Sequence, residues 1–311
     1  MDISGAKPIE IGNKPVFDQY FGQYPPEISE FTFTNLYMWR DYYHWEWVEV
    51  DNHLLIFSRD YLREHRTPIR GNPETMMFMP PVGNDPGLLI CALFEELGGI
   101  EFHRVPRSLW EVLLQGNDRV AVLGIQWQDD RDNWDYVYER NAIATLGGGT
   151  LKPKRKWLNR FMEHYQYEFR SISPDEPELL ACCRAAQETW CALNACEDTP
   201  ALSYEHDAIL DAFDHYIDLR YGGSLILIDN DCIAYTLGER LNADTLVVHI
   251  EKAHAHIDGA YQGIMSLFLQ RPDFAAIPFV NREQDVGEPG LRRAKESYAP
   301  HHMVEKGILF M

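Results

Sequence analysis

Apolar and polar positions in the first half of the chain predict a mixture of strands and helices. The apolar runs 45–50 and 53–58 are rich in aromatic and β-branched residues, and they predict two strands around a turn at Asp51 and Asn52. We expect one helix to begin near Thr32 or Thr34 and another at Pro86, where a pair of glycines ends it. Further strands are expected at 75–79, 100–105 and 132–138.

The second half repeats this order with different residues. Ser173 and Pro174 predict the N-cap and the first position of its first helix, and Asp229 to Asp231 predict a hairpin turn. In chain order, we expect a strand at 164–172, helices at 173–193 and 203–219, strands at 224–229, 232–239 and 245–252, a helix at 260–269, a strand at 275–281, a helix at 290–298 and a closing segment at 301–311.

The two halves have similar lengths and a similar order of elements. Gly147 to Gly149 mark a sharp turn or a domain junction between them. We therefore predict two tandem domains that mix helices and strands, residues 1–150 and residues 151–311.

Composition indicates a folded protein with a sizeable core, since 45% of its 311 residues are hydrophobic and 13% are aromatic. No apolar run approaches the roughly 18 residues of a membrane span, and the N-terminus lacks the pattern of a signal peptide, so we expect a cytoplasmic protein. The six cysteines are expected to be free thiols, three of them (Cys182, Cys183 and Cys191) as small core residues of a helix.

A net charge of -20 argues against a broad surface for nucleic acid or for an anionic membrane. One segment departs from this composition, because residues 151–161 contain no acid and five cations: Lys152, Lys154, Arg155, Lys156 and Arg160. In so acidic a chain, such a segment is either a local anion site or a solvated face.

Residues 247–263 combine an apolar run with three histidines, a glutamate and a lysine. Strand alternation places His249 and Glu251 on one face and Lys252 on the other. Either His249 or Glu251 is suited to accept the proton of an attacking amine. The structural alternative is that His249 is a hydrogen-bonded residue and that Glu251 pairs with Lys252 or Arg282. The spacing of the histidines matches no zinc motif, so we predict no metal site.

A polar loop after the strand at 275–281 is a second candidate, because ligands often bind beyond strand ends. There, Arg282 is suited to hold a carboxylate or a phosphate, and Glu283 or Asp285 to bind a substrate amine, next to Asn281. The structural alternative is that Asp285 forms a capping box with Glu288 at the start of the next helix.

Three motifs carry a family resemblance: KPKRKWLNRF at 152–161, VVHIEKAHAHIDGAYQGIM at 247–265 and FVNREQDVGEPGLRRAKESYAP at 279–300. Together with the element order, they resemble the family named after the C-terminal domain of phosphatidylglycerol lysyltransferase, without its membrane domain. The resemblance implies an α+β fold of two tandem GNAT-like (acyl-CoA N-acyltransferase-type) domains, each a mixed, mostly antiparallel sheet flanked by helices. It also implies transfer of an aminoacyl group from tRNA.

The GNAT-like fold implies further site residues. The donor lies along the strand that contains Lys252, its phosphates meet the turn at Gly259, and Tyr298 is the general acid for the leaving group. The structural alternative is that Tyr298 is a packing residue with a hydrogen-bonded hydroxyl. A glycine-rich pyrophosphate loop is absent from the sequence, so a coenzyme A donor is not firmly implied. In this interpretation Lys154, Arg155 and Arg160 hold the phosphates of the donor.

We therefore predict an acyl or aminoacyl transferase with its active site in the second domain and with aminoacyl-tRNA or acyl-CoA as the phosphate-bearing donor. The alternative is a non-catalytic protein of the same fold that binds an anionic small molecule.

Overall fold

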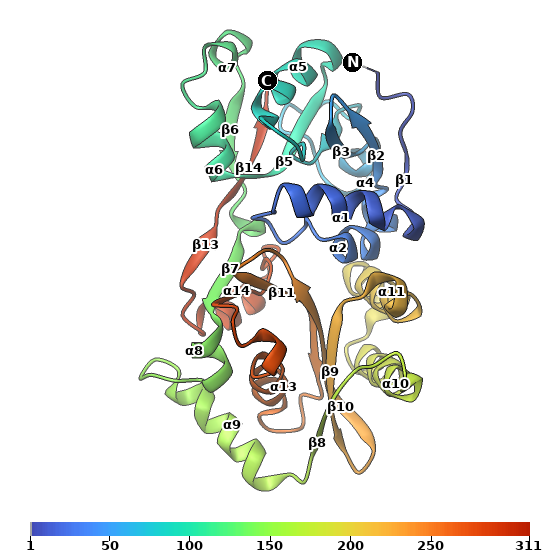
Figure 1. The fold of residues 1–311 in the computed structure, drawn as a ribbon, viewed down its shortest axis with the longest axis vertical. Coiled ribbons are helices and arrows are strands. Elements are labelled where there is room, and N and C mark those ends of the chain that lie inside the picture. The colour runs from blue at the N-terminus through green and yellow to red at the C-terminus, as the bar shows by residue number, and fades with distance from the viewer. Residues whose placement is uncertain (1) are drawn as a thin grey trace. The chain divides into compact units, whose positions relative to one another are not determined.

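The structure is a computed structural model that describes residues 2–311, except for the side chain of Leu113 (Figure 1). The chain forms two units: residues 2–135, 284–288 and 304–311 make the first, and residues 136–283 and 289–303 make the second. The units therefore divide between Asp135 and Tyr136 rather than at the expected junction near residue 150. The C-terminal strand also belongs to the first unit, because its backbone pairs with strands of that unit.

The first unit contains a seven-stranded sheet in the order β1-β2-β3-β4-β5-β14-β6. Its strands are mostly antiparallel, and β4 and β5 pair in parallel. The strands are β1 (Lys7–Pro8), β2 (Glu46–Val50), β3 (His53–Ser58), β4 (Met76–Phe78), β5 (Ile100–Pro106), β6 (Gln126–Asp129) and β14 (Lys306–Phe310). The helices are η1 (Ile11–Asn13), α1 (Lys14–Gln23), α2 (Phe33–Met38), α3 (Arg40–Tyr43), α4 (Tyr61–His65), α5 (Pro86–Leu97), α6 (Arg107–Leu109), η2 (Trp110–Leu114), α7 (Asp118–Leu123) and η3 (Arg131–Asn133).

The second unit contains a seven-stranded sheet in the order β13-β7-β12-β11-β10-β9-β8. Helix α13 covers one face of this sheet, and helices α10 and α11 cover the other (Figure 1). The strands are β7 (Asp135–Glu139), β8 (Glu168–Ser171), β9 (Gly222–Ile228), β10 (Asp231–Arg240), β11 (Thr245–Ala253), β12 (Phe279–Asn281) and β13 (His302–Val304). The helices are α8 (Arg140–Thr145), α9 (Lys152–His164), α10 (Pro177–Leu193), η4 (Cys196–Asp198), α11 (Pro200–Asp214), α12 (Tyr216–Leu219), α13 (Ala260–Leu269), η5 (Pro272–Phe274) and α14 (Pro289–Glu296).

Local sequence explains several of these elements. Asp229 and Asn230 join β9 to β10 with φ angles of 54° and 70°, the left-handed conformation that tight hairpin turns require. Asp51 and Asn52 join β2 to β3 in the same way, and the side chain of Thr32 caps α2 by accepting a hydrogen bond from the Asn35 N–H. The predicted turns and this helix start are therefore confirmed.

Two predictions about the second unit were wrong. Helix α10 begins at Pro177 rather than at Pro174, and Ser173 instead accepts a hydrogen bond from the backbone N–H of Asp175. The later proline supplies the fixed φ that favours the first helical position. Cys191 and Cys196 form a disulfide rather than free thiols, because the turn after α10 brings the two cysteines together.

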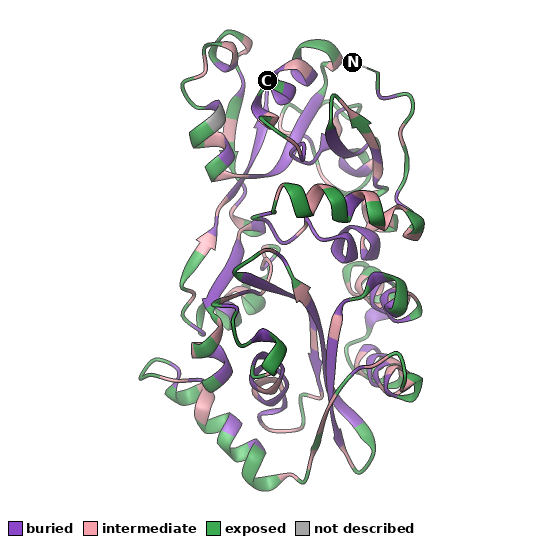
Figure 2. Ribbon diagram, in the orientation of Figure 1, coloured by how far each residue is buried: buried purple, intermediate pink, exposed green. Residues whose placement is uncertain are grey.

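The central strands of both sheets are buried, whereas the edge strands β1, β6 and β8 are largely exposed (Figure 2). Among the described residues, none of the helices is long and apolar enough to cross a membrane.

Candidate active site

The candidate site of the second unit lies where two parallel strands separate. Strands β11 and β12 pair only over Thr245–Val247 and Phe279–Asn281. Beyond that point β11 continues to Ala253, whereas β12 ends and the chain turns away. His249 and Glu251 follow the separation on β11, and Arg282 and Glu283 follow it after β12, so the two sequence motifs meet here.

His249 lies between two carboxylates and is almost fully buried. Its Nδ1 is 2.8 Å from Oε1 of Glu283, its Nε2 is 3.0 Å from Oε1 of Glu239, and the side chain is 2% exposed. Burial alone would lower the pKa of this imidazole, but the hydrogen bonds to Glu239 and Glu283 outweigh it and raise the pKa to about 9. A raised pKa favours the protonated imidazole at neutral pH, which counts against the predicted role of general base for this residue.

Backbone irregularities explain how His249 reaches both partners. Leu237 of β10 pairs with Ile250 and the next residue, Gly238, pairs with Val248, so His249 is the extra residue of a β-bulge. On the other side, Glu283 adopts φ +56° and its N–H donates to Oδ1 of the buried Asn281 at 2.8 Å. Asn281 thus shapes the turn that directs Glu283 to His249.

Glu251 and Arg282 form a buried ion pair with unused hydrogen-bonding capacity. Nη2 of Arg282 donates to Oε1 of Glu251 at 3.2 Å, and the side chains are 14% and 11% exposed. Oε2 of Glu251 and Nη1 of Arg282 are buried and have no partner among the described residues. Burial raises the pKa of Glu251, although Arg282 and Lys295 act in the opposite direction. Two unsatisfied polar atoms of opposite character at one place can contact a bound ligand or ordered water.

Tyr298 lies beside this pair with cations near its ring. The guanidinium of Arg282 is 5.1 Å from the ring centroid, and the ammonium of Lys154 is 4.5 Å from it. The hydroxyl of Tyr298 accepts a hydrogen bond from Nε2 of Gln262 at 3.0 Å, and burial raises the pKa of this hydroxyl. Burial and the nearby Arg282 lower the pKa of Lys154.

Sequence reasoning missed three residues of the site: Glu239, Gln262 and Lys295. The ammonium of Lys295 donates to the backbone oxygen of Arg282 at 2.5 Å and so fixes the backbone beside the ion pair. Lys295 and Gln262 lie within the motifs at 279–300 and 247–265, and this position was the sequence signal that could have indicated them.

A cavity of about 250 Å³ adjoins Tyr298 in the second unit. Tyr138, Ile143 and Leu151 form apolar walls, and the backbone of the glycine turn at 147–149 forms its rim. Its volume approaches the lower end of typical small-ligand sites. Tyr298 is therefore shared between the cavity and the Glu251–Arg282 pair.

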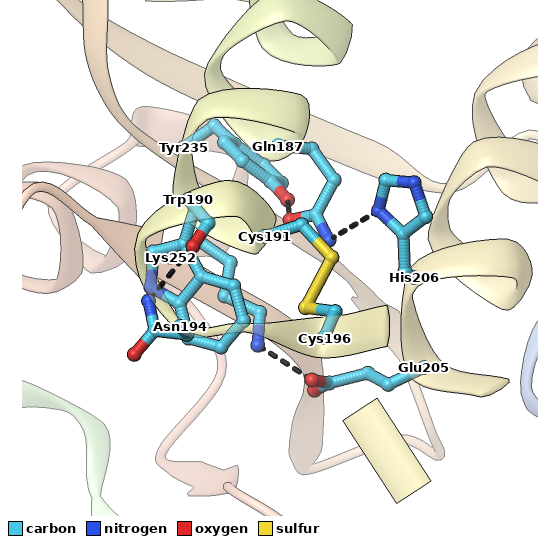
Figure 3. Close-up of a disulfide and its surroundings, with 9 residues drawn as sticks. All are labelled: Gln187, Trp190, Cys191, Asn194, Cys196, Glu205, His206, Tyr235 and Lys252. Atoms are coloured by element: carbon cyan, nitrogen blue, oxygen red, sulfur yellow. Dashed lines mark hydrogen bonds and ion pairs between the residues drawn. A yellow bond between two sulfur atoms is a disulfide. The ribbon is translucent and has the colours of Figure 1, made fainter. Parts of the chain in front are cut away.

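The structure places three predicted site residues elsewhere. Lys252 points to the opposite face of β11, where its ammonium donates to Glu205 at 2.7 Å and lies 3.6 Å from the ring centroid of Trp190, close to the disulfide (Figure 3). Gly259 is a packing position, since a Cβ there would lie 2.3 Å from the backbone oxygen of Trp157. Asp285 belongs to the first unit, where it pairs with Arg131 at 3.1 Å and accepts a hydrogen bond from the N–H of Gly287.

The basic segment does not act as one cluster. It forms helix α9, on which Lys154 alone points to Tyr298. Arg155 donates to the backbone oxygens of Leu146 and Gly148 and so stabilises the glycine turn. Arg160 pairs with Asp258 at 3.2 Å, an acid that is far from it in sequence.

No group of three or more metal-ligating side chains is arranged around a metal site in the part of the chain that the structure describes. His254 and His256 stack on each other with ring centroids 5.4 Å apart.

Comparison with known proteins identifies the family. The family model described as phosphatidylglycerol lysyltransferase, C-terminal, matches residues 21–309. The chain belongs to this family. Its match covers both units and every residue of the candidate site.

Similar proteins extend this result. The structure of a conserved protein of unknown function from Bacteroides thetaiotaomicron is 28% identical, with a TM-score of 0.81 over 98% of each chain. The structure of L-PGS from Bacillus licheniformis is 11% identical, with a TM-score of 0.64 over 95% of this chain and 91% of that one. An uncharacterized protein of Mycoplasmoides gallisepticum is 27% identical over 183 residues, which span 56% of this chain and 55% of that relative. The predicted fold of two tandem GNAT-like domains is confirmed.

Proposed function

We propose that the chain is an aminoacyl transferase that moves an aminoacyl group from the 3′ ester of an aminoacyl-tRNA to an amine or hydroxyl acceptor. The observation that carries this proposal is the buried pair of unpartnered atoms, Oε2 of Glu251 and Nη1 of Arg282. One is an acceptor that can take a proton, and the other is a fixed donor that can stabilise a developing negative charge. Membership of a family named for lysyl transfer supports this reaction class.

In this proposal the acceptor nucleophile attacks the ester carbonyl, a bond to the carbonyl carbon forms, and the bond to the 3′ oxygen breaks. Oε2 of Glu251 takes the proton of the nucleophile, a task for which a raised carboxyl pKa is suited. Nη1 of Arg282 donates to the carbonyl oxygen as its negative charge grows. The hydroxyl of Tyr298 protonates the leaving 3′ oxygen and regains its proton from Glu251, so protons balance over one turnover.

Two cations have supporting roles. Lys154 lies over the ring of Tyr298 and offers positive charge to the terminal phosphate of the donor. In this proposal His249 stays protonated at neutral pH. It holds Glu239 and Glu283 and so stabilises the turn that directly follows Arg282.

The test measures loss of the amino acid from radiolabelled aminoacyl-tRNA in the presence of a panel of acceptors, including phosphatidylglycerol vesicles and free amines, with acyl-CoA as a competing donor class. We expect acceptor-dependent turnover, and we expect Glu251→Gln to lower the rate by about 100-fold or more, as loss of a positioned base does. Glu205→Gln is the matched control, because Glu205 also pairs with a cation but on the opposite face of β11.

An unchanged rate in Glu251→Gln would remove Glu251 from the reaction. Tight binding of donor without transfer to any acceptor would favour the non-catalytic binding protein instead.

A further inference from the structure

A disulfide closes the turn between helices α10 and α11. It joins Cys191, in the last turn of α10, to Cys196, which lies five residues later in the short helix η4. The two cysteines are buried, whereas residues 192–195 and 197–200 are exposed. An exposed turn with few buried contacts opens locally at low cost. A reductant therefore reaches the sulfurs through a small local opening of this turn.

The first half of α11 has no apolar anchor of its own. Residues 200–207 are exposed or half-buried, and the buried residues of this helix all follow them. Glu205 accepts a hydrogen bond from Nζ of Lys252 at 2.7 Å, and Nδ1 of His206 is 3.2 Å from Nε2 of Gln187 on α10 (Figure 3). This half of α11 is therefore held by polar contacts and by the disulfide that precedes it.

Lys252 is a buried cation that both helices enclose. Its side chain is 9% exposed, and its ammonium lies 3.6 Å from the ring centroid of Trp190 on α10 while it pairs with Glu205 on α11. Trp190 directly precedes Cys191 in the chain. A lysine is rarely buried unless it is paired. Movement of α11 away from the sheet would remove the carboxylate and drive Lys252 toward solvent, so the disulfide and the burial of Lys252 are coupled.

The remaining thiols of the chain are poorly suited to redox exchange. Cys91, Cys183 and Cys232 are buried, and Cys182 is half-buried. Burial raises the pKa of Cys91 and of Cys182, and a hydrogen bond with Cys232 together with burial raises the pKa of Cys183. The thiolate is the reactive form of cysteine, so a raised pKa keeps these groups unreactive. Redox chemistry is therefore concentrated at Cys191 and Cys196.

We propose that the Cys191–Cys196 disulfide is a redox-sensitive clip that holds the first half of α11 over Lys252. A dithiol reductant opens the clip, because one of its thiolates attacks a sulfur, the S–S bond breaks and a mixed disulfide forms. The second thiol of the reductant then displaces the protein sulfur. The protein gains two electrons and two protons, and the reductant becomes a disulfide. The first half of α11 detaches, while Ile209 and Phe213 keep the rest of the helix packed.

The clip acts on the strand that carries the candidate site. Lys252 directly follows Glu251 on β11, and successive side chains of a strand point to opposite faces of the sheet. The pair of Lys252 with Glu205 thus holds the end of β11 from the face opposite to Glu251. Opening of the clip loosens this end of β11, so the redox state of the disulfide reaches the candidate site.

The first experiment measures the oxidation state of the two cysteines. Protein purified without reductant is denatured in iodoacetamide, digested with trypsin and analysed by mass spectrometry. Cleavage after Arg184 and Arg220 gives a peptide whose cysteines are Cys191 and Cys196. This peptide should carry no alkyl group before treatment with dithiothreitol and two after it. Two alkyl groups before reduction would overturn the proposal.

The second experiment measures local release in the native protein with and without dithiothreitol. Acetylation of Lys252 by an N-hydroxysuccinimide ester should be about tenfold faster after reduction, because its ammonium then reaches solvent. Lys156, which is exposed on α9, should react at the same rate in both states. Cleavage by glutamyl endopeptidase after Glu197 in the turn should also accelerate, whereas cleavage after the exposed Glu74 of the first unit should not.

Variants separate the clip from other effects of the reductant. Cys191→Ser/Cys196→Ser should show fast acetylation of Lys252 with or without dithiothreitol, whereas Cys182→Ser, the matched control on the same helix, should respond to reduction as the unaltered protein does. Equal acetylation of Lys252 in the oxidised and reduced protein would overturn the proposal. Faster cleavage after Glu74 as well would indicate global unfolding and would also contradict a local clip. None of these readouts depends on the transfer reaction, so the clip and the proposed function fail separately.

Discussion

Deprotonation of His249 should destabilise the second unit as the pH rises. Glu239 and Glu283 raise the pKa of this imidazole from an ordinary 6.5 to about 9 in the folded chain, and the ring is 2% exposed. One pKa unit corresponds to 1.36 kcal/mol, so the charged ring stabilises the folded state by about 3 kcal/mol.

The direction in which stability changes with pH depends on whether the folded or the unfolded state binds the proton more tightly. The folded pKa lies above the unfolded pKa, so the folded state holds the proton over the range between them. The stabilisation is complete below about pH 6.5 and is lost as the pH rises through about 9. At the upper end, a neutral ring has one N–H and can no longer donate to both carboxylates.

Urea unfolding of the unaltered protein and of His249→Gln at a series of pH values from 6 to 10 measures this effect. We expect the difference in unfolding free energy to be largest at pH 6 and to shrink by about 3 kcal/mol by pH 10. His164→Gln, which changes an exposed histidine at the end of α9, should show no such pH-dependent difference. Subtracting the unfolding free energy of the variant from that of the unaltered protein at each pH cancels the contributions of other groups that titrate in the same range.

A constant difference between the unaltered protein and His249→Gln across this range would refute the reasoning. It would mean that the folded and unfolded states hold this proton equally well, so that the ring has an ordinary pKa, is largely neutral above about pH 7 and is again available as a base.

Two further predictions concern packing and buried charge. Gly259→Ala should lower the unfolding free energy by more than about 1 kcal/mol, because Gly259 has φ +82° and a Cβ would meet the Trp157 backbone. Gly290→Ala is the control and should not destabilise the protein, because a Cβ there would have nothing within 4 Å. Equal urea midpoints for the two variants would contradict this prediction. Lys306→Met in the first unit should cost about 3–5 kcal/mol, because Lys306 is fully buried and pairs with the carboxylates of Glu30 and Asp135. A urea-measured loss below about 1 kcal/mol would show that these carboxylates are neutral or solvated.

Local sequence was sufficient for most strands of both units and for helices such as α5, α10 and α13, whereas α1, α7, α8 and α9 were not predicted. Asp229 and Asn230 tolerate the left-handed conformation that their hairpin requires, and Pro86 fits the first position of α5, so short-range chemistry decides these elements. The family was also readable from sequence, because its three motifs contain unusual residue types at fixed spacing. The pairing of Glu251 with Arg282 was one of two structural alternatives that the residues allowed.

Only the tertiary structure decided how the charged residues are used. Glu239 reaches His249 because a bulge in β11 lets both strands place a side chain there, and no local pattern indicates it. Lys252 directly follows Glu251, yet the pleat of β11 sends it to Glu205 on the opposite face. Charge and residue type are properties of the sequence, whereas a pKa of about 9 or an unpartnered carboxylate oxygen depends on burial and on neighbours that are distant along the chain.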